Sequence, residues 1–446
     1  MRPVELMEVL EAREARVQRQ QELLTKYNRP LVCFTMNIAG PIKNSEEIAW
    51  GFFYGSGLLL RQLERVKAPV LYRQILEKIT GNEGYFVVDL EPVRLKELMV
   101  ELEDNLEIGR LFDLDVLSPD GQKLTRPHER GCIICGAAGK ACARSRAHSV
   151  EQLQERTADI LKQAYQTWKA DTVGEFACRA LLYEACTTPK PGLVDCRNSG
   201  SHTDMDLFSF LSSASALRPY FAQCVRIGCD TACLSPQDTF SMLRWPGKMA
   251  EMRMLHVTGG VNTHKGAIFT LGVLCGALGR LDHHAWKNPE KILSECSSMT
   301  SGLSDQELKS MGKTETTGEQ IYQKFGVSGI RGQVEAGLPA VRQYGFPELL
   351  RQIEHGASLE YAGCMALLSL ILHTDDTNLL KRGGLEGQKW AVEQINRLLY
   401  DQKPTIQTLE ELDQRFINRN LSPGGAADLL AVCYFLYFLM QFDWNP

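Results

Sequence analysis

The sequence predicts a multidomain protein in which an N-terminal α/β or α+β domain precedes an all-α domain. The chain has 446 residues, more than one compact domain commonly holds, so two or three units are expected. Between about residues 30 and 120, short β-rich runs alternate with helical patterns. From about residue 170 this alternation ends, and long amphipathic or apolar segments follow one another between loops rich in Gly, Pro and Asn.

The elements of the first domain follow from the spacing of apolar residues. Short runs with β-branched and aromatic side chains predict strands at 31–36, 84–89 and 111–117. Helical spacing predicts an amphipathic helix at the start of the chain and further helices at 45–63, 70–79 and 94–105. Strands separated by helices are typical of an α/β or α+β unit.

The second half is predicted to contain helices alone. Long apolar or amphipathic stretches predict helices at 206–224, 267–281, 357–373, 390–399 and 427–441. The polar stretch 149–167 is expected to be a helix that closes the first domain before Trp168 opens the second. The expected domains are therefore residues 1–167 and 168–446.

Composition excludes several classes of protein. With 44% hydrophobic and 23% charged residues the chain is neither disordered nor fibrous. A net charge of −5 argues against a general nucleic-acid binder, which usually has a basic excess.

The start of the chain lacks the apolar core of a secretory signal. The longest apolar runs, 361–372 and 429–442, are shorter than the roughly 20 residues that cross a bilayer. We therefore expect a cytoplasmic protein without a membrane or nucleic-acid partner.

Two carboxylates in the first half alternate along a predicted strand. In the segment Leu111-Phe112-Asp113-Leu114-Asp115 both aspartates fall on one face, because side chains two apart in a strand point the same way. Carboxylates at this spacing can bind Mg²⁺ together with phosphate oxygens, as nucleotidyl transfer requires. The alternative is a solvent-facing strand edge. The spacing alone leaves both interpretations open and favours the strand edge; under the other interpretation the domain is nucleotidyltransferase-like, with Asp113 and Asp115 as catalytic metal ligands.

Downstream lies a group that we call the thiol cluster, which consists of Cys132, Cys135, Cys142 and His148. Three thiols and an imidazole could form a tetrahedral Zn²⁺ site, although the spacing matches no standard zinc finger. The alternative is a thiol-rich loop whose cysteines only pack. The other cysteines mostly stand singly in apolar surroundings and are expected to be reduced. Arg144 and Arg146 belong to a local basic patch that suits phosphate or an acidic partner.

The first half resembles a known family through three motifs. These are Asn37-Ile38-Ala39-Gly40-Pro41-Ile42-Lys43, Gly109-Arg110-Leu111-Phe112-Asp113-Leu114-Asp115-Val116 and Cys142-Ala143-Arg144-Ser145-Arg146-Ala147-His148. Over residues 10–165 the chain is similar to the holo-acyl-carrier-protein synthase of citrate lyase. That family transfers a phosphoribosyl-dephospho-CoA group to a serine of the acyl carrier (gamma) subunit of the lyase and releases pyrophosphate. The resemblance implies that Asp113 and Asp115 bind the metal and that Arg110 contacts the substrate.

Four polar loops rich in glycine interrupt the helical half. The first contains Lys190 between two prolines and continues to Asp204 and Asp206. The second is Gly259-Gly260-Val261-Asn262-Thr263-His264-Lys265-Gly266 before a helix, where free backbone N–H groups bind phosphate readily. It is not a Walker A sequence, so an ordinary P-loop enzyme is not expected. The alternative for each loop is a capped helix entry.

The third and fourth loops combine carboxylates, cations and free amides. They are Asp375-Asp376-Thr377-Asn378-Leu379-Leu380-Lys381-Arg382-Gly383-Gly384 and Ser422-Pro423-Gly424-Gly425-Ala426-Ala427-Asp428. Between the second and third loops lies Thr316-Thr317-Gly318-Glu319, which adds an acid. Several such loops on one scaffold predict a polyphosphate site with a divalent metal.

Together these loops resemble triphosphoribosyl-dephospho-CoA synthase, and the similarity covers about residues 170–446. That family joins ATP to 3′-dephospho-CoA and expels adenine, so a base, a stabiliser of positive charge on the ribose and a clamp on the triphosphate are needed. We expect the phosphate and substrate ligands to be Lys190, Gly260, Asn262, His264, Lys265, Asn378, Lys381, Arg382, Gly424 and Gly425. Acids expected in catalysis or Mg²⁺ binding are Asp204, Asp206, Glu319, Asp375 and Asp376.

The sequence therefore suggests a fusion of two consecutive enzymes with ATP and 3′-dephospho-CoA as substrates and Mg²⁺ as cofactor. Three alternatives remain open at this point. The acceptor could be the carrier protein of malonate decarboxylase, which uses the same chemistry. The first half could be a zinc-stabilised docking module without activity. The second half could be an ordinary ATP-dependent kinase that releases ADP.

Overall fold

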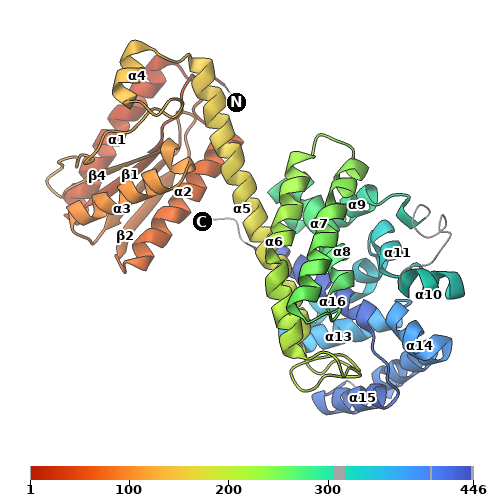
Figure 1. The fold of residues 1–446 in the computed structure, drawn as a ribbon. Helices are drawn as coiled ribbons and strands as arrows, with labels where there is room; N and C mark the ends of the chain where they lie inside the picture. Colours follow the sequence, from red (N-terminus) through yellow and green to blue (C-terminus); the bar gives the residue numbers. More distant parts are fainter. Residues whose placement is uncertain (1, 305–316, 402–403, 443–446) are drawn as a thin grey trace. The chain divides into compact units, whose positions relative to one another are not determined.

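The computed structural model describes residues 2–304, 317–401 and 404–442. The chain forms two compact units, the first ending at Gln166 and the second extending from Thr167 to Phe442 (Figure 1). The long helix α5 (Val150–Cys186) contributes residues to both units. Each unit is described separately below.

The first unit consists of a four-stranded sheet with helices packed around it. In chain order its elements are α1 (Leu6–Tyr27), β1 (Leu31–Met36), α2 (Glu46–Arg65), β2 (Val70–Leu76), β3 (Glu83–Val88), α3 (Pro92–Asn105), the 3₁₀ helix η1 (Ile108–Leu111), β4 (Phe112–Leu117), α4 (Gly139–Ser145) and the first part of α5. The strand order is β2-β3-β1-β4, and every pairing is antiparallel. The unit is therefore α+β, and the three predicted strands are confirmed as β1, β3 and β4.

The helix predicted at 70–79 is wrong, because this segment forms β2. Apolar residues at 70, 71, 75 and 76 imitate a helical stripe, but the segment pairs with β3 from Val70↔Val88 to Leu76↔Glu83. Its side chains alternate between half-buried and exposed near the start of the strand, as expected at the edge of a sheet. Tertiary pairing outweighs the local helical pattern here.

Different helices cover the two faces of this sheet. Leu23 and Leu24 of α1 pack against Leu31 and Cys33 of β1 on one face. On the other face Phe52 of α2 stacks on Phe34 of β1, with ring centroids 4.7 Å apart. Cys33 is the partner of Asp115 in the β1–β4 register. Asp115 therefore lies on the same face of the sheet as α1. The helix α1 covers this face over the strands β1 and β3.

Within its described residues the second unit contains helices and no strand, which agrees with the predicted all-α domain. Its elements are the second part of α5, α6 (Leu207–Asp230), α7 (Pro236–Val257), α8 (Lys265–Arg280), η2 (His283–Lys287), α9 (Pro289–Met299), α10 (Thr317–Phe325), α11 (Gly329–Glu335), the π-helical turn η4 (Val341–Gly345), α12 (Phe346–Glu354), α13 (Leu359–Leu372), α14 (Thr377–Asp401), α15 (Ile406–Asn418) and α16 (Gly424–Gln441).

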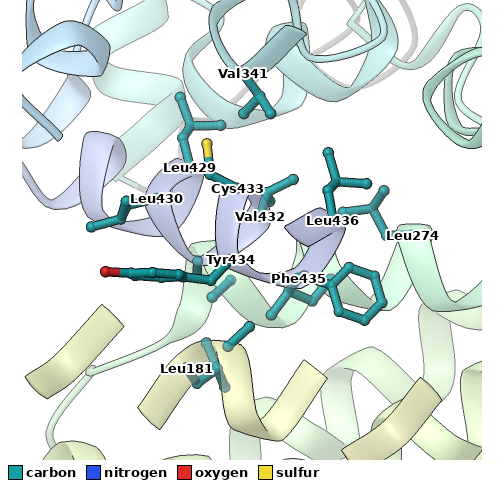
Figure 2. Close-up of a cluster of buried hydrophobic side chains, with 14 of the residues drawn as sticks. Leu181, Leu274, Val341, Leu429, Leu430, Val432, Cys433, Tyr434, Phe435 and Leu436 are labelled. Atoms are coloured by element: carbon teal, nitrogen blue, oxygen red, sulfur yellow. The ribbon is translucent and has the colours of Figure 1, made fainter. Parts of the chain in front are cut away.

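Helix α16 forms the centre of this unit. It packs against α8, α12, α13, α14 and the turn η4. Figure 2 shows its residues 429–436 between Leu181 of α5, Leu274 of α8 and Val341 of η4. The hydroxyl of Tyr434 forms a hydrogen bond of 2.7 Å with Thr187, so even the polar atom in this core has a partner.

By length and composition α16 is one helix, among the described residues, that could cross a membrane. It starts at Gly424, before the apolar run expected at 429–442, and so reaches 18 residues. However, 67% of it is buried inside the unit. A buried central helix of a globular core has the same composition, so the hydropathy of α16 is explained by its packing.

Candidate active sites

The first unit contains a cavity of about 1320 Å³ beside β4. Asp113 and Asp115 line it, as the alternation of β4 predicts, because Leu114 and Val116 turn the other way into the core. Six cationic side chains also line the cavity, together with two more acids, Glu103 and Glu129; the cations are Lys96, Arg110, Lys123, Arg126, Arg130 and Arg146. The cavity therefore brings an acidic pair next to a strongly basic wall.

The two aspartates differ in their surroundings. Lys123 donates to Asp115 over 2.6 Å from the segment that folds back beside the end of β4. Desolvation by the cavity walls raises the pKa of Asp113, and the charge of Asp115 raises it further. A cation bound near Asp113, in addition to Lys123, would lower the pKa of Asp113 again. The pair of aspartates is therefore suited to binding a positive ion.

Buried charges hold β4 at its free edge. Lys96 of α3 donates to the carbonyl of Leu114 over 2.9 Å, and the carboxylate of Glu103 accepts from the Leu114 N–H over 2.8 Å. Arg130 donates to the carbonyls of Phe112 and Gly109. Sequence reasoning missed Lys96, Glu103 and Lys123, because their role depends on contacts between separate elements. Charged residues in a helix that is otherwise amphipathic were the only available signal.

The three arginines predicted to bind phosphate in this unit differ in their position relative to the cavity. Arg110 and Arg146 line the cavity, and Arg110 also donates to the carbonyl of Gly131 over 2.7 Å. Arg144 is exposed on α4 and is not among the residues that line the cavity. The structure thus places two of these three arginines in the same cavity as the aspartates.

The thiol cluster is assembled at one end of the same cavity. One ligand atom from each of its four residues lies within 4.8 Å of the other three. The Sγ atoms of Cys135 and Cys142 are 3.8 Å apart, and all three cysteines are free thiols. The Nε2 atom of His148 is buried and makes no hydrogen bond with the described residues.

In the second unit, three of the four predicted loops meet. Arg382 donates to the carbonyl of Ser201 over 2.7 Å and contacts His202. His202 in turn is 2.9 Å from the hydroxyl of Ser422. Segments from positions near 200, 380 and 420 are therefore in direct contact, as a shared site requires.

Lys190 points into the protein and does not face solvent. Its ammonium group is 1% exposed and lies 2.5 Å from the carboxylate of Glu184 in α5. Asp195 accepts from the backbone N–H of Lys190 and closes the loop. Because the charge of Lys190 is already paired, this arrangement does not support a direct contact with phosphate. Glu184 was missed because no motif surrounds it.

The starts of α8, α14 and α16 converge on two carboxyl groups, the buried Asp376 and the half-buried Asp428. Asp376 accepts from the backbone N–H of Asn378 in α14 over 2.8 Å and from that of Ala426 in α16 over 2.8 Å. Burial raises the pKa of Asp376, and these backbone donors oppose the shift. Since both its oxygens accept N–H groups, Asp376 acts here as a cap for two helices.

Asp428, in the first turns of α16, is the second of these groups. Burial raises its pKa well above the ordinary value, and the charges of Glu184 and Asp376 add to this, whereas the Ala267 N–H opposes it. A Cβ at Gly266 would lie only 1.9 Å from the Asp428 carboxylate, so the start of α8 approaches Asp428 closely. Asp428 is the last residue of the fourth predicted loop, but no role of its own was predicted for it from the sequence.

The second predicted loop leads into α8 beside this cluster. His264 is buried, its Nδ1 is 2.7 Å from the hydroxyl of Ser213, and its Nε2 makes no hydrogen bond with described residues. Burial, with a smaller effect from Lys190, lowers the pKa of His264 to about 3, so the ring is neutral at neutral pH. Asn262 accepts from the Lys265 N–H, and Lys265 pairs with Glu251 on the surface. Gly260 is exposed with φ +94°.

The remaining predicted residues lie in several places. Asp206 caps α6 and accepts from Ser209, and Asp204 is largely exposed beside His202. Asp375 is exposed and accepts from Gln388, whereas Asp376 is buried. Lys381 and Asn378 are exposed, and a Cβ at Gly424 would lie 2.6 Å from the Asn378 amide. Gly425 lies close to Asp376. The side chain of Glu319 lies outside the described residues.

Comparison with known families matches both units. Residues 4–164 match the family described as apo-citrate lyase phosphoribosyl-dephospho-CoA transferase. Residues 170–446 match ATP:dephospho-CoA triphosphoribosyl transferase. These ranges correspond to the two compact units on either side of position 166.

Similar proteins span either the whole chain or its second part. Protein CitXG of Haemophilus influenzae is 36% identical over 97% of this chain and 96% of its own. Protein CitXG of Leuconostoc mesenteroides subsp. cremoris is 32% identical over the same shares. The 2-(5''-triphosphoribosyl)-3'-dephosphocoenzyme-A synthase of Haemophilus ducreyi is 39% identical over 69% of this chain and 99% of its own. The chain therefore belongs to the transferase family that joins an apo-citrate lyase phosphoribosyl-dephospho-CoA transferase to an ATP:dephospho-CoA triphosphoribosyl transferase.

Proposed function

We propose that the two units catalyse consecutive steps. Residues 168–446 make 2′-(5″-triphosphoribosyl)-3′-dephospho-CoA from ATP and 3′-dephospho-CoA and release adenine. Residues 1–167 then transfer the phosphoribosyl-dephospho-CoA group to a serine of the acyl carrier (gamma) subunit of citrate lyase and release pyrophosphate. Family membership in both units supports this order of reactions. We place both steps in the cytoplasm, where ATP and dephospho-CoA are available.

The observation that carries the transfer step is the acidic pair inside a basic cavity. Asp113 and Asp115 line one side, and the arginines and lysines of the other sides can bind the triphosphate of the donor. In the transfer, the serine oxygen forms a bond to the phosphorus next to the ribose. The bond from this phosphorus to the pyrophosphate breaks, and the serine proton leaves to a base or to solvent. This is a nucleotidyl transfer, in agreement with a nucleotidyltransferase-like domain.

The residues of the cavity fit Mg²⁺. Asp113 and Asp115 offer the one or two carboxylates that this ion uses beside phosphate oxygens, and a bound cation would offset the desolvation and the charge of Asp115 that raise the pKa of Asp113. Mg²⁺, when bound, neutralises charge on the leaving pyrophosphate. Lys123, which now pairs with Asp115, would exchange that partner for a phosphate oxygen.

For the first step we propose Asp428 as the general base. The 2′-hydroxyl of dephospho-CoA forms a bond to C1 of the ATP ribose, the bond from C1 to adenine breaks, and adenine takes up a proton as it leaves. The hydroxyl proton passes to the ionised carboxylate of Asp428, which lies where the start of α8 closely approaches α16. The neutral His264, whose Nε2 makes no hydrogen bond with the described residues, offers one hydrogen bond to a substrate.

The triphosphate of ATP is assigned to the exposed cations and amides around this cluster. Lys381, Arg382 and Lys265 lie near the starts of α14 and α8, where helix N-termini favour anions. Lys190 is assigned a positioning role, because its ammonium group already pairs with Glu184.

A single incubation tests both steps. The full chain is mixed with ATP, 3′-dephospho-CoA, Mg²⁺ and the apo-form of the citrate lyase carrier. Free adenine and a carrier heavier by one phosphoribosyl-dephospho-CoA group are expected. ADP in place of adenine would show a kinase and contradict the first step. Adenine without modified carrier would contradict the second step.

A parallel incubation tests the acceptor. The apo-carrier of malonate decarboxylase replaces that of citrate lyase at equal concentration, and the mass of each carrier is followed over time. We expect faster modification of the citrate lyase carrier. Preference for the other carrier would reassign the second step to malonate decarboxylase.

A further inference from the structure

We propose that the thiol cluster binds one structural Zn²⁺ and that this ion fixes one wall of the transfer cavity. Neither family description mentions a metal at these residues. The metal site itself is independent of the proposed function, and only its effect on the cavity depends on it. Three separate observations carry the inference.

The first observation is the distance between thiols. Zinc bonds sulfur at about 2.3 Å in tetrahedral sites, which places two sulfur ligands about 3.8 Å apart. The Sγ atoms of Cys135 and Cys142 are 3.8 Å apart. A disulfide would need a separation of about 2.05 Å, so these thiols are spaced as ligands of one ion and not as a covalent pair.

The second observation is the donor set. Four ligand atoms from three cysteines and one histidine lie within 4.8 Å of one another. Cys₃His is a standard set for closed zinc sites, which have no open position for a substrate. The buried Nε2 of His148 lacks a hydrogen-bond partner among the described residues, and a metal would supply the missing interaction.

The third observation is the backbone between Cys132 and Cys135. The N–H of Gly136 donates to the carbonyl of Cys132 over 3.0 Å, and Gly136 has φ +74°. This tight turn directs both thiols to one side, and glycine adopts its conformation without strain. The residues on either side of the turn, Gly131 and Ala138, form an isolated antiparallel bridge.

The cluster is connected directly to the cavity. Cys132, Cys142 and His148 are among the residues that line it. Gly131, next to Cys132, accepts from Arg110, and Arg130 holds the carbonyl of Phe112 at the start of β4. A zinc ion that fixes the segment 131–148 would therefore fix the positions of Arg110 and Arg130 relative to Asp113.

Metal content gives the direct test. The full chain is purified without chelators, and its metals are measured by mass spectrometry. We expect about one zinc per chain, and less than about 0.2 zinc per chain after Cys135→Ser. The matched control is Cys233→Ser, which changes an exposed thiol outside the cluster and should retain the zinc. Zinc below about 0.2 per chain in the wild type, or iron in its place, would overturn the proposal.

Two further measurements apply even if Cys135→Ser does not fold. Wild-type chain refolded with Co²⁺ should show the visible absorption of tetrahedral cobalt thiolate, and octahedral spectra would contradict the site. Removing zinc from the wild type should slow carrier modification by about tenfold or more and leave adenine release unchanged. Bound zinc whose removal does not affect modification would refute the role in the cavity wall, whereas zinc without any modification activity would refute the proposed transfer function.

Discussion

The two candidate active sites of this chain differ in how they use charged residues. In the first unit, Asp113 and Asp115 line a cavity, and Lys123 pairs with the Asp115 carboxylate. In the second unit, Lys190 and Asp376 face inward and hold loops together. A charged motif in a loop therefore marks where a site lies, but burial decides whether its members contact the ligand or position the residues that do.

The largest effect is expected from the acidic pair. Asp113→Asn combined with Asp115→Asn should reduce carrier modification on the order of 10³-fold or more, because the metal and its stabilisation of the leaving group are lost. Adenine release should not change. Adenine is measured by chromatography and the carrier by mass spectrometry. Asp89→Asn, a change at an exposed ion pair on the same unit, serves as control. Full modification by the double variant would exclude these residues from catalysis.

The next effect is expected at Asp428. Asp428→Asn should slow adenine release by about 10²- to 10⁴-fold, since a general base is removed. Modification of carrier from supplied triphosphoribosyl-dephospho-CoA should continue at the normal rate. Glu386→Gln, an exposed acid on α14, is the control. Normal adenine release by Asp428→Asn would assign the base to another group.

The same variant gives a pH signature. The pKa of Asp428 is raised in the folded protein, so the folded state binds a proton more readily than the unfolded state. The free energy of unfolding therefore falls as pH rises from the ordinary carboxyl range towards the raised pKa. Asp428→Asn should make this fall shallower in urea unfolding curves. An unchanged or steeper slope would show that Asp428 does not carry a raised pKa.

A stability loss is expected at Lys190. Lys190→Met leaves the buried carboxylate of Glu184 without its partner and should cost about 3–5 kcal/mol in the free energy of unfolding. Lys265→Met removes only a surface ion pair and should cost at most about 1 kcal/mol. Urea denaturation followed by circular dichroism measures both. A Lys190→Met variant that remains stable but no longer releases adenine would support the direct contact between Lys190 and phosphate that the sequence predicts.

The smallest effect is expected at Asp206. It accepts from the Ser209 N–H as the cap of α6, so Asp206→Ala should lower the free energy of unfolding slightly, by less than Lys190→Met does in the same urea denaturation. Adenine release should stay normal at 25 °C, and Asp206→Asn should restore stability because an amide oxygen also caps. Loss of activity in both folded variants would support the catalytic role expected from the sequence.

Much of the first site follows from sequence because strands obey a simple rule. Alternation in β4 placed Asp113 and Asp115 on one face, and the structure confirms this. The spacing of the thiol cluster likewise pointed to a shared position, which the structure shows. The strand β2 was missed, because pairing with β3 is not encoded in its own periodicity.

The second site is less predictable because it depends on side-chain direction. The four loops were recognised, yet the inward direction of Lys190 follows from Glu184, six residues earlier on α5. The closeness of Asp428 to Gly266 joins residues more than 160 positions apart in sequence. Neither relation has a local signature, so both require the folded chain.

The central place of α16 has a consequence for the order in which the second unit is built. Every helix that α16 contacts comes earlier in the chain. During synthesis those helices leave the ribosome with their apolar faces uncovered, and they stay so until residues 424–441 follow. The first unit depends less on its last residues, because its sheet is complete at Leu117 and the first part of α5 must still pack onto α2. The second unit is thus the part of the chain most exposed to aggregation or chaperone binding before synthesis ends.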